Sequence, residues 1–374
     1  MNSGMGTCPN FLFSRVMGSK DMEDNRFISD RLIRWYEANR RDLPWRETLD
    51  PYLIWISEVI LQQTRVNQGL EYYYRFTARF PSVRALAEAG EDEVMKYWQG
   101  LGYYSRARNL HAAAKQVMER YDGRFPSTRE EVLSLKGIGE YTAAAICSFA
   151  FGLPYAAVDG NVYRVLSRVF GVDLPIDSGE GKKYFSRLAQ DLLDERRPGL
   201  FNQAMMEFGA LQCVPRSPDC GCCPLADKCR ALAEKRVDSL PVKAGKTVVK
   251  PRFFNYLDIR HGNALLLKKR SGQDIWQNLY EFPLIETDRP FSWEELQETA
   301  DFRALFDGIR EVRFLRVREF KKHVLSHRVI FPVFYRLEVS EYSSGMAAYL
   351  QVADDALETY AVSRLIQAYL EREL

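Results

Sequence analysis

The sequence has no hydrophobic run long enough to cross a membrane. Its longest uncharged stretch, residues 141–158, is rich in alanine and is interrupted by Gly152 and Pro154, whereas a spanning helix needs about 20 apolar residues. Residues 1–24 lack the basic and then apolar pattern of a secretory signal. A strong excess of one charge is also missing, since the net charge is +2, so any binding of nucleic acid depends on local basic patches. We expect a cytoplasmic protein without a membrane segment.

Cysteine is scarce outside one short segment. The chain has seven cysteines, and five of them fall within seventeen residues. Four thiolates at this spacing, C-x6-C-x2-C-x5-C, can surround one soft metal centre such as a [4Fe–4S] cluster. Zinc usually takes two C-x2–4-C pairs, and only one occurs here, so zinc is a weaker alternative. The absence of a metal is also weaker, because scattered core cysteines would not cluster in this way. The expected ligands are Cys213, Cys220, Cys223 and Cys229, although the sequence leaves open an exchange of Cys223 for Cys222.

Strand-like alternation is missing from the first part of the chain. Between residues 25 and 233 apolar residues recur at helical spacing and prolines separate the segments, which predicts an all-α domain. Residues 234–251 combine basic residues with Pro, Gly and Ser and are predicted to form a linker. Residues 252–374 are rich in β-branched and aromatic residues, which predicts a smaller α+β domain. Residues 1–24 are predicted to be a disordered tail. The expected strands of the second domain are 253–259, 264–268, 312–318 and 329–339, and its expected helices are 292–306 and 353–373.

Two glycines lie two residues apart in the segment LKGIGEYTA, residues 135–143. Gly137 and Gly139 allow a tight turn with positive φ and a close approach of the backbone to a ligand. The helix expected to begin near Tyr141 would direct its free N–H groups at this turn, which suits a phosphate. The turn at a helix C-terminus can have the same two glycines. The glycines alone are therefore weak evidence for a DNA-binding hairpin, and the neighbouring motifs are needed to support it.

Two carboxylates lie in contexts that suit the cleavage of a glycosidic bond. Asp159 precedes Gly160, Asn161 and a predicted helix, so it is an expected N-cap that stays ionised. Glu58 lies among apolar residues of another predicted helix, and burial would favour the protonated form that a general acid needs. In such reactions one acid protonates the leaving group, while one carboxylate supports the oxocarbenium-like sugar.

Together these motifs resemble those of adenine DNA glycosylases of the MutY type, within the endonuclease III-like superfamily. The resemblance covers the whole α domain. Its matching stretches are RDLPWR at 41–46, SEVILQQT at 57–64, QGLGYYSR at 99–106, the glycine hairpin, VDGNV at 158–162 and the cysteine run. The resemblance implies a helix–hairpin–helix glycosylase with a [4Fe–4S] cluster, acting in base excision repair.

The resemblance also implies a role for each candidate residue. Glu58 would protonate the adenine and later help to activate water, and Asp159 would stabilise the oxocarbenium ion, directly or as a transient sugar ester. Asn161 and Tyr141 would support that centre. The residues implied to contact DNA are Trp45 and Arg46 in the adenine pocket, Gln63 and Tyr103 as wedges in the duplex, and Gly137 and Gly139 in the hairpin. The plainer alternatives are core aromatic residues at positions 45 and 103, and surface polar groups at 46 and 63.

Position 141 distinguishes two kinds of enzyme within this superfamily. The bifunctional members carry a lysine there, whose amine forms a Schiff base with the sugar. Tyr141 cannot form an imine, and Lys136 lies on the other side of the hairpin glycines. The resemblance therefore implies a monofunctional glycosylase with little lyase activity.

The second domain resembles the Nudix-like domain that recognises 8-oxoguanine opposite adenine in this family. The segment GQDIWQNLYEFP, residues 272–283, carries the resemblance, and Leu325, Ser326 and His327 stand where the family often has Phe-Ser-His. Leu325 stands where the family often has phenylalanine, so this loop lacks the aromatic side chain that could contribute to recognition. The R-E-x-x-E-E pattern of active Nudix hydrolases does not follow Pro283, so we expect binding without hydrolysis.

The predicted function is the excision of adenine mispaired with 8-oxoguanine or guanine, by base flipping and acid-assisted hydrolysis. The expected partner is double-stranded DNA containing these mispairs, and the expected enzyme is a monomer associated with the nucleoid. A glycosylase with lyase activity is the nearest alternative, and Tyr141 argues against it. An electron-transfer iron–sulfur protein, or a non-catalytic DNA-binding module, would leave the pair Glu58 and Asp159 unexplained.

Overall fold

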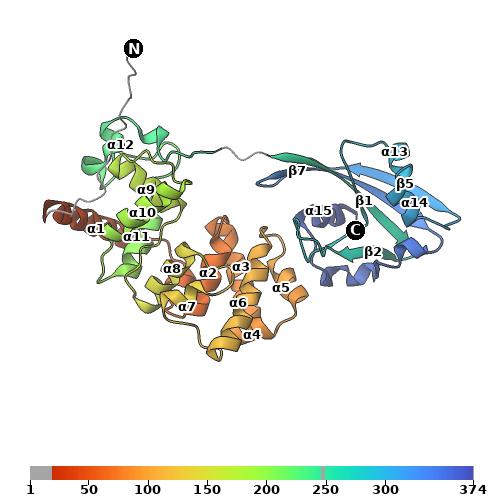
Figure 1. Cartoon of the computed structure of the whole chain (residues 1–374), viewed down its shortest axis with the longest axis horizontal. Coiled ribbons are helices and arrows are strands. Elements are labelled where there is room, and N and C mark those ends of the chain that lie inside the picture. The colour runs from red at the N-terminus through yellow and green to blue at the C-terminus, as the bar shows by residue number, and fades with distance from the viewer. Residues whose placement is uncertain (1–18, 246–248, 374) are drawn as a thin grey trace, which may run out of the picture. The chain divides into compact units, whose positions relative to one another are not determined.

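The computed structural model describes residues 19–245 and 249–373 (Figure 1). These residues form two compact units. The first unit contains residues up to Leu49 and the segment Glu140–Ala244, and the second contains Asp50–Gly139 and the chain from Gly245 onward. Residues 1–18 of the predicted tail and residues 246–248 of the predicted linker lie outside the described residues. The first helix begins at Ser19, so the end of the predicted tail was placed too far along the chain.

The first unit is a bundle of helices. Its core joins the apolar face of α1 to α9, α10 and α11, and includes Leu32, Tyr36, Leu166 and Phe208, each at most 1% exposed. The α1 positions recur at helical spacing, so one face of the helix is buried. The elements are α1 (Ser19–Asn39), the 3₁₀ turn η1 (Pro44–Arg46), α8 (Glu140–Phe151), α9 (Gly160–Phe170), α10 (Gly179–Leu192), α11 (Pro198–Leu211), η2 (Ala226–Lys228), α12 (Arg230–Ala233) and η3 (Val237–Ser239).

The second unit contains six helices between Asp50 and Gly139. Helix α2 packs against α3, and α6 packs against α4 and α5. Aromatic side chains fill the space between them: Phe76 lies with its ring centroid 4.9 Å from that of Phe80 and 5.8 Å from that of Trp98. The helices are α2 (Pro51–Leu61), α3 (Val66–Arg79), α4 (Val83–Glu88), α5 (Glu91–Trp98), α6 (Ser105–Tyr121) and α7 (Arg129–Leu133).

The rest of the second unit is a mixed sheet of eight strands in the order β3-β2-β1-β7-β5, with β4, β6 and β8 paired to β1, β7 and β2. Only β1 and β7 run parallel among the pairs of the described strands. The strands are β1 (Lys250–His261), β2 (Ala264–Lys269), β3 (Tyr280–Glu281), β4 (Leu284–Thr287), β5 (Val312–Glu319), β6 (His323–Val324), β7 (Arg328–Val339) and β8 (Leu350–Ala353).

Helices cover both faces of this sheet (Figure 1). Phe254 and Tyr256 of β1 pack with α15, and Leu257 and Ile259 pack with α13 and α14 on the other face. This division follows the alternation of side chains along a strand, and the layers confirm the predicted α+β class of the second domain. The covering elements are α13 (Trp293–Gln297), α14 (Ala300–Leu305), η4 (Ser344–Met346), η5 (Asp354–Thr359) and α15 (Arg364–Glu373).

The predicted elements of the second domain are confirmed in position but differ in detail. Each of the four predicted strands is present, whereas β3, β4, β6 and β8 were not predicted. The predicted helix 292–306 is divided into α13 and α14 because Thr299 caps a new helix by accepting a hydrogen bond from the N–H of Phe302. Similarly, only Arg364–Glu373 of the predicted helix 353–373 is α-helical.

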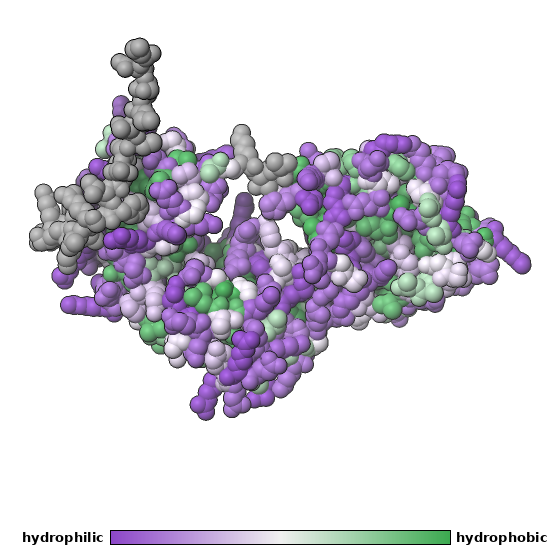
Figure 2. Space-filling view, viewed as in Figure 1, coloured by the Kyte–Doolittle hydropathy of each residue, from purple (hydrophilic) through white to green (hydrophobic). Residues whose placement is uncertain are grey.

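No helix in the described part of the chain combines the length and apolarity needed to span a bilayer. The face seen in Figure 2 is largely hydrophilic, with hydrophobic residues in smaller groups.

Candidate active site

Asp159 caps the N-terminus of α9, as the sequence predicted. Its Oδ1 accepts hydrogen bonds from the backbone N–H groups of Asn161 (2.9 Å) and Val162 (2.8 Å), and its Oδ2 accepts one from Nδ2 of Asn161 (2.8 Å). Burial raises the pKa of Asp159 above its ordinary value, although these hydrogen bonds lower it. The sequence predicted an ionised Asp159 from its place at the helix N-terminus, but that prediction did not include this effect of burial on its pKa. The carboxylate is therefore fixed in direction and only partly solvated.

A hydrogen-bonded chain connects this carboxylate to the cysteine-rich loop. Arg164 donates from Nη2 to Oδ1 of Asn161 (2.8 Å) and to the carbonyl of Gly209 (2.6 Å), and from Nε to the carbonyl of Cys213 (2.7 Å). Gly209 has to be glycine, because a Cβ there would lie 2.6 Å from Cβ of Asn161. Arg164 was not predicted as a functional residue, since its partners at Gly209 and Cys213 are backbone carbonyls, which sequence motifs do not record.

The glycine hairpin has the predicted positive φ at only one of its two glycines. Gly137 has a φ of 79°, and a Cβ there would approach Cβ of Asn109 to 2.5 Å. Gly139 has an ordinary φ and open space around its Cα. Only Gly137 therefore has the left-handed conformation that favours glycine. Tyr141 lies half-buried in the first turn of α8, with its hydroxyl 3.9 Å from Sδ of Met206.

Glu58 is buried in α2, with a relative exposure of 5%. Trp55, Ile56, Val59 and Ile60 are buried beside it in the same helix. The apolar surroundings predicted from the sequence are therefore present. Glu58 belongs to the second unit and Asp159 to the first.

Arg46 and Trp45 lie in the turn η1, which is fixed by a buried carboxylate on α11. Glu207 is 1% exposed and accepts from Nε and Nη2 of Arg41 (2.8 and 2.6 Å) and from Nη1 and Nη2 of Arg46 (3.1 and 2.7 Å). Burial alone would raise the pKa of Glu207, but the two guanidinium groups lower it to about 2. Trp45 is 8% exposed. Sequence reasoning missed Glu207, although a lone acid in an apolar helix was a usable signal.

Two predicted DNA-contacting residues have left-handed backbone conformations. Gln63 has a φ of 56° and Tyr103 a φ of 46°, a region that costs about 1–2 kcal/mol for a residue with a Cβ. Strain of this kind is often found at functional sites. Both side chains are exposed, with Tyr103 at 47%, so the alternative of a core aromatic residue at position 103 is wrong.

The loop that follows β6 meets Tyr103. The hydroxyls of Tyr103 and Ser326 lie 2.6 Å apart, within hydrogen-bonding distance. The loop closes through a hydrogen bond from the N–H of Leu325 to the carbonyl of Arg328 (2.8 Å). Ser326 and His327 are exposed, while Leu325 packs against the core of the domain. The structure thus brings two predicted DNA-contacting residues together.

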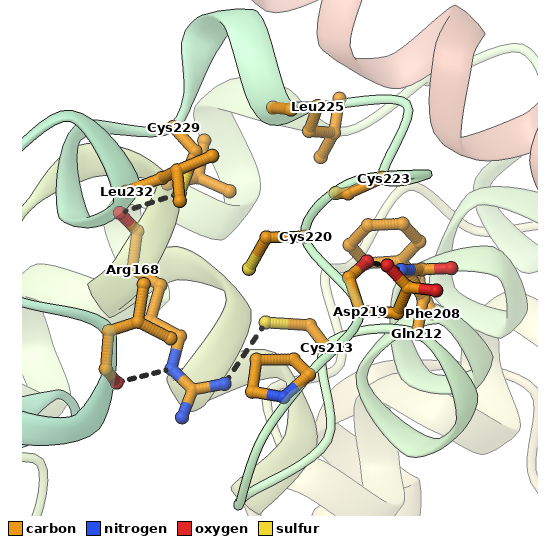
Figure 3. A pocket seen from close by; sticks show the side chains of 14 residues that line it. Arg168, Phe208, Gln212, Cys213, Asp219, Cys220, Cys223, Leu225, Cys229 and Leu232 are labelled. Carbon is orange, nitrogen blue, oxygen red and sulfur yellow. Dashed lines mark hydrogen bonds between the residues drawn. The ribbon is translucent and has the colours of Figure 1, made fainter. Parts of the chain in front are cut away.

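All four predicted ligand cysteines line one pocket (Figure 3). Its other lining residues are mostly apolar, such as Phe208 and Leu225. Burial raises the pKa of Cys223 to about 11 and also raises those of Cys220 and Cys229. Cys222 is exposed and does not line this pocket. The pocket therefore favours Cys223 over Cys222 as a ligand.

Arg168 of α9 connects the start of the cysteine-rich loop to the segment that follows α12. Its side chain is 1% exposed, and Nη1 lies 3.4 Å from Sγ of Cys213 and 2.8 Å from the carbonyl of Val214. Its Nε donates to the carbonyls of Val237 (3.0 Å) and Leu240 (3.1 Å). A buried guanidinium beside thiolates would offset part of their charge. Arg168 was not predicted from the sequence.

Two family models match this chain: the HhH-GPD superfamily base excision DNA repair protein over residues 56–191, and the NUDIX domain over residues 255–372. The adenine DNA glycosylase of Buchnera aphidicola subsp. Baizongia pistaciae is 34% identical over 307 residues, which cover 80% of this chain and 83% of that protein. The enzyme of the same name from Buchnera aphidicola subsp. Acyrthosiphon pisum is 36% identical over 257 residues, or 68% of this chain and 73% of the relative.

Solved structures agree with the helical fold. A thermostable thymine-DNA glycosylase aligns with a TM-score of 0.53 and 31% identity over 57% of this chain and 98% of its own. An endonuclease III in a non-covalent DNA complex, 23% identical, shares the fold with a TM-score of 0.50 over 57% of this chain and 97% of its own. Together with the HhH-GPD match and the adenine DNA glycosylase relatives, these findings define a DNA glycosylase of base excision repair, which hydrolyses N-glycosyl bonds.

Within that class, the chain belongs to the adenine DNA glycosylase family, because it is 34% and 36% identical to these two relatives over 83% and 73% of their lengths.

Proposed function

We propose that this enzyme excises adenine paired with 8-oxoguanine or guanine and leaves the DNA backbone intact. The observation that carries the proposal is the Asp159 carboxylate, which three N–H donors fix at the start of α9. Such a group stabilises positive charge on a sugar without having to reorganise during the reaction. The names of the curated relatives supply adenine as the excised base.

The proposed mechanism divides the work between two carboxyl groups. Glu58, buried among apolar side chains, protonates the adenine as the N-glycosidic bond breaks and then helps to activate water. Asp159 stabilises the oxocarbenium ion, directly or as a transient sugar ester, and Asn161 keeps it in position. Tyr141 supports this centre and supplies no amine, so no Schiff base forms.

DNA recognition is proposed to use residues of both units. The adenine leaves the stack and contacts Trp45 and Arg46, the latter held by Glu207. Gln63 and Tyr103 enter the duplex where the base departs. The backbone of the hairpin at Gly137 and Gly139 contacts a phosphate, because glycine lets the chain approach closely. We also expect the enzyme to act as a monomer at the nucleoid.

Duplexes with adenine opposite each of the four normal bases and 8-oxoguanine test this function. Release of adenine should be fastest opposite 8-oxoguanine and guanine, and strands should break only after alkali treatment. Strand breakage without alkali would show lyase activity and contradict the role of Tyr141. Equal release opposite all bases would contradict the proposed mispair specificity.

The loop residues Ser326 and His327 are proposed to contact 8-oxoguanine. Their replacement together by alanine should narrow the preference for 8-oxoguanine over guanine by about 1–3 kcal/mol, or roughly 5–150-fold, the usual value of a specific base contact. Single-turnover rates on both mispairs measure the change, and the rate opposite guanine should change little.

A matched control replaces Ser271 and Gln273 by alanine, because both are exposed in another loop of the same domain. The control should keep the wild-type preference. If the Ser326 and His327 variant instead loses the same factor on both mispairs, the loop anchors DNA without recognising the base.

The pocket lined by the four cysteines is proposed to hold a [4Fe–4S] cluster, and its chemistry fits one. Four thiols converge in an apolar pocket beside the Arg168 guanidinium. Among the residues described, no three His, Cys, Asp or Glu side chains meet closely enough to hold a single metal ion. Each cysteine of a four-iron cluster binds a different iron, so the four sulfur atoms lie farther apart than they would around a single zinc ion. Cysteines that do not meet at one point therefore suit the cluster better than zinc. When bound, the cluster would crosslink the loop 213–229.

Cys220→Ser is expected to remove visible absorbance and iron from the purified protein and to weaken DNA binding in the folded fraction. The loop carries Arg216 and Lys228, and cluster ligation would fix their positions relative to phosphates. Cys222→Ser is the control and should keep the iron content, since Cys222 lies outside the pocket. An iron-free wild-type protein with full activity would contradict the cluster.

A further inference from the structure

Arg106, in the first turn of α6, donates hydrogen bonds only to backbone carbonyls. Its Nη1 lies 2.8, 2.9 and 2.6 Å from the carbonyl oxygens of Val59, Ile60 and Gln62. Its Nη2 lies 3.3 and 3.1 Å from those of Leu101 and Gly102. One guanidinium group therefore connects the C-terminal end of α2 to the loop between α5 and α6.

The buried charge of Arg106 is balanced without a carboxylate. The residue is 8% exposed, and no acidic side chain pairs with it among the described residues. The last carbonyls of a helix lack partners and carry partial negative charge, so a cation there is favourable. The ring of Trp98 adds a cation–π contact at 5.1 Å. Burial lowers the pKa of Arg106 to about 10, and the group stays charged at neutral pH.

Two of the five carbonyls bound by Arg106 directly precede the two strained residues of this unit that are proposed to enter DNA. Gln62 is followed by Gln63 (φ 56°), and Gly102 is followed by Tyr103 (φ 46°). The guanidinium also lies 5.7 Å from the ring centroid of Tyr103. A non-glycine residue persists in a left-handed conformation only when its surroundings hold it there. Arg106 fixes the peptide on the N-terminal side of each residue.

We propose that Arg106 is a positioning residue that holds Gln63 and Tyr103 in the backbone conformations they need to enter the duplex and extrude the base. The inference rests on the proposed function. It accounts for both strained residues with one side chain. Lysine cannot replace it, because an ammonium group has three donors and no planar fork to span two backbone segments.

Arg106→Lys should therefore harm the extrusion of a stacked base more than the chemistry that follows. With adenine opposite 8-oxoguanine, we expect the single-turnover rate to fall by about 10-fold or more, as for the loss of roughly 1.4 kcal/mol of positioning energy. With adenine opposite an abasic-site analogue, extrusion is cheaper because pairing is already lost. There the loss should be about threefold or less.

The control is Tyr52→Phe, which removes a buried hydrogen bond from the Tyr52 hydroxyl to the carbonyl of Phe80 (2.6 Å) without touching either proposed wedge residue. Its rates on the two duplexes should change by the same factor. Equal losses for Arg106→Lys on both duplexes would overturn the positioning role. Absence of adenine release by the wild-type enzyme from the duplex with 8-oxoguanine would instead overturn the proposed function.

Gly102→Ala tests the same arrangement in a variant that does not disturb the buried charge. Gly102 has a φ of 75°, and a Cβ there meets no atom within 4 Å. The substitution therefore strains only the backbone whose carbonyl Arg106 binds. The same selective loss on the stacked adenine is expected, and an unchanged rate on that duplex would contradict the proposal.

Discussion

Glu58→Gln should bind mispaired DNA normally and release adenine about 10²–10⁴-fold more slowly, the usual contribution of a general acid. Glutamine has nearly the shape of glutamic acid, so the buried site in α2 (5% exposed at Glu58) should keep its packing. It cannot give up a proton to the leaving base. Single-turnover release of adenine, measured beside equilibrium binding to the same duplex, separates the two effects.

Glu71→Gln provides the control for this substitution, since Glu71 is an exposed glutamate on α3. It should leave both rate and binding unchanged. A near wild-type rate for Glu58→Gln would mean that another group protonates the base, and a parallel loss of binding would mean that Glu58 acts mainly through the fold.

Asp159→Asn should lower the rate of adenine release by about 10²–10³-fold, as expected when one preorganised electrostatic group is lost. Asparagine can still accept the N–H groups of Asn161 and Val162 through its oxygen. In the wild-type protein Nδ2 of Asn161 donates to Oδ2 of Asp159 at 2.8 Å. In the variant the NH₂ group of the new asparagine would face this Nδ2, so two donors would oppose each other. The loss therefore has a charge component and a hydrogen-bond component.

The exchange variant Asp159→Asn with Asn161→Asp separates these components, because it restores a donor and an acceptor while moving the charge. We expect its rate to stay low, and recovery toward wild type would show that the hydrogen bond alone matters. A pH series gives a second check. Burial raises the pKa of Asp159, so wild-type activity should fall on the acid side as the pH drops through that raised value.

Local chemistry explains which parts of the site were predictable. The N-cap at Asp159 follows from a short acceptor beside the first free N–H groups of a helix, and the sequence shows both. The surroundings of Glu58 follow from apolar neighbours in the same helix. The contacts of Arg106, and those of Arg164 with Gly209 and Cys213, were not predictable, because these partners are backbone carbonyls that any residue type carries. The hydrogen bonds between Arg41 and Glu207 were not predictable either, because they join residues far apart in the chain.

The same distinction applies to the second domain. Strands β1 and β7 have 12 residues each, long enough for their composition to be recognised. Strand β3 has two residues, and it exists because β2 and its neighbours offer hydrogen-bonding partners. The bulge between Phe314 and Arg316 on β5 is likewise set by pairing with β7, so the alternation of its side chains could not be taken from the sequence alone.

The composition of the first unit from two separated segments affects how the protein is made. Helix α1 buries its apolar face against α10 and α11, which leave the ribosome only after residues 50–139 have been synthesised. At about 5–20 residues per second, Asn39 waits roughly 10–30 s for Pro198 to follow. During that time Leu32 and Tyr36 lack the partners that α11 supplies, so a nascent chain stalled before α11 exposes part of the apolar face of α1 to chaperones and proteases.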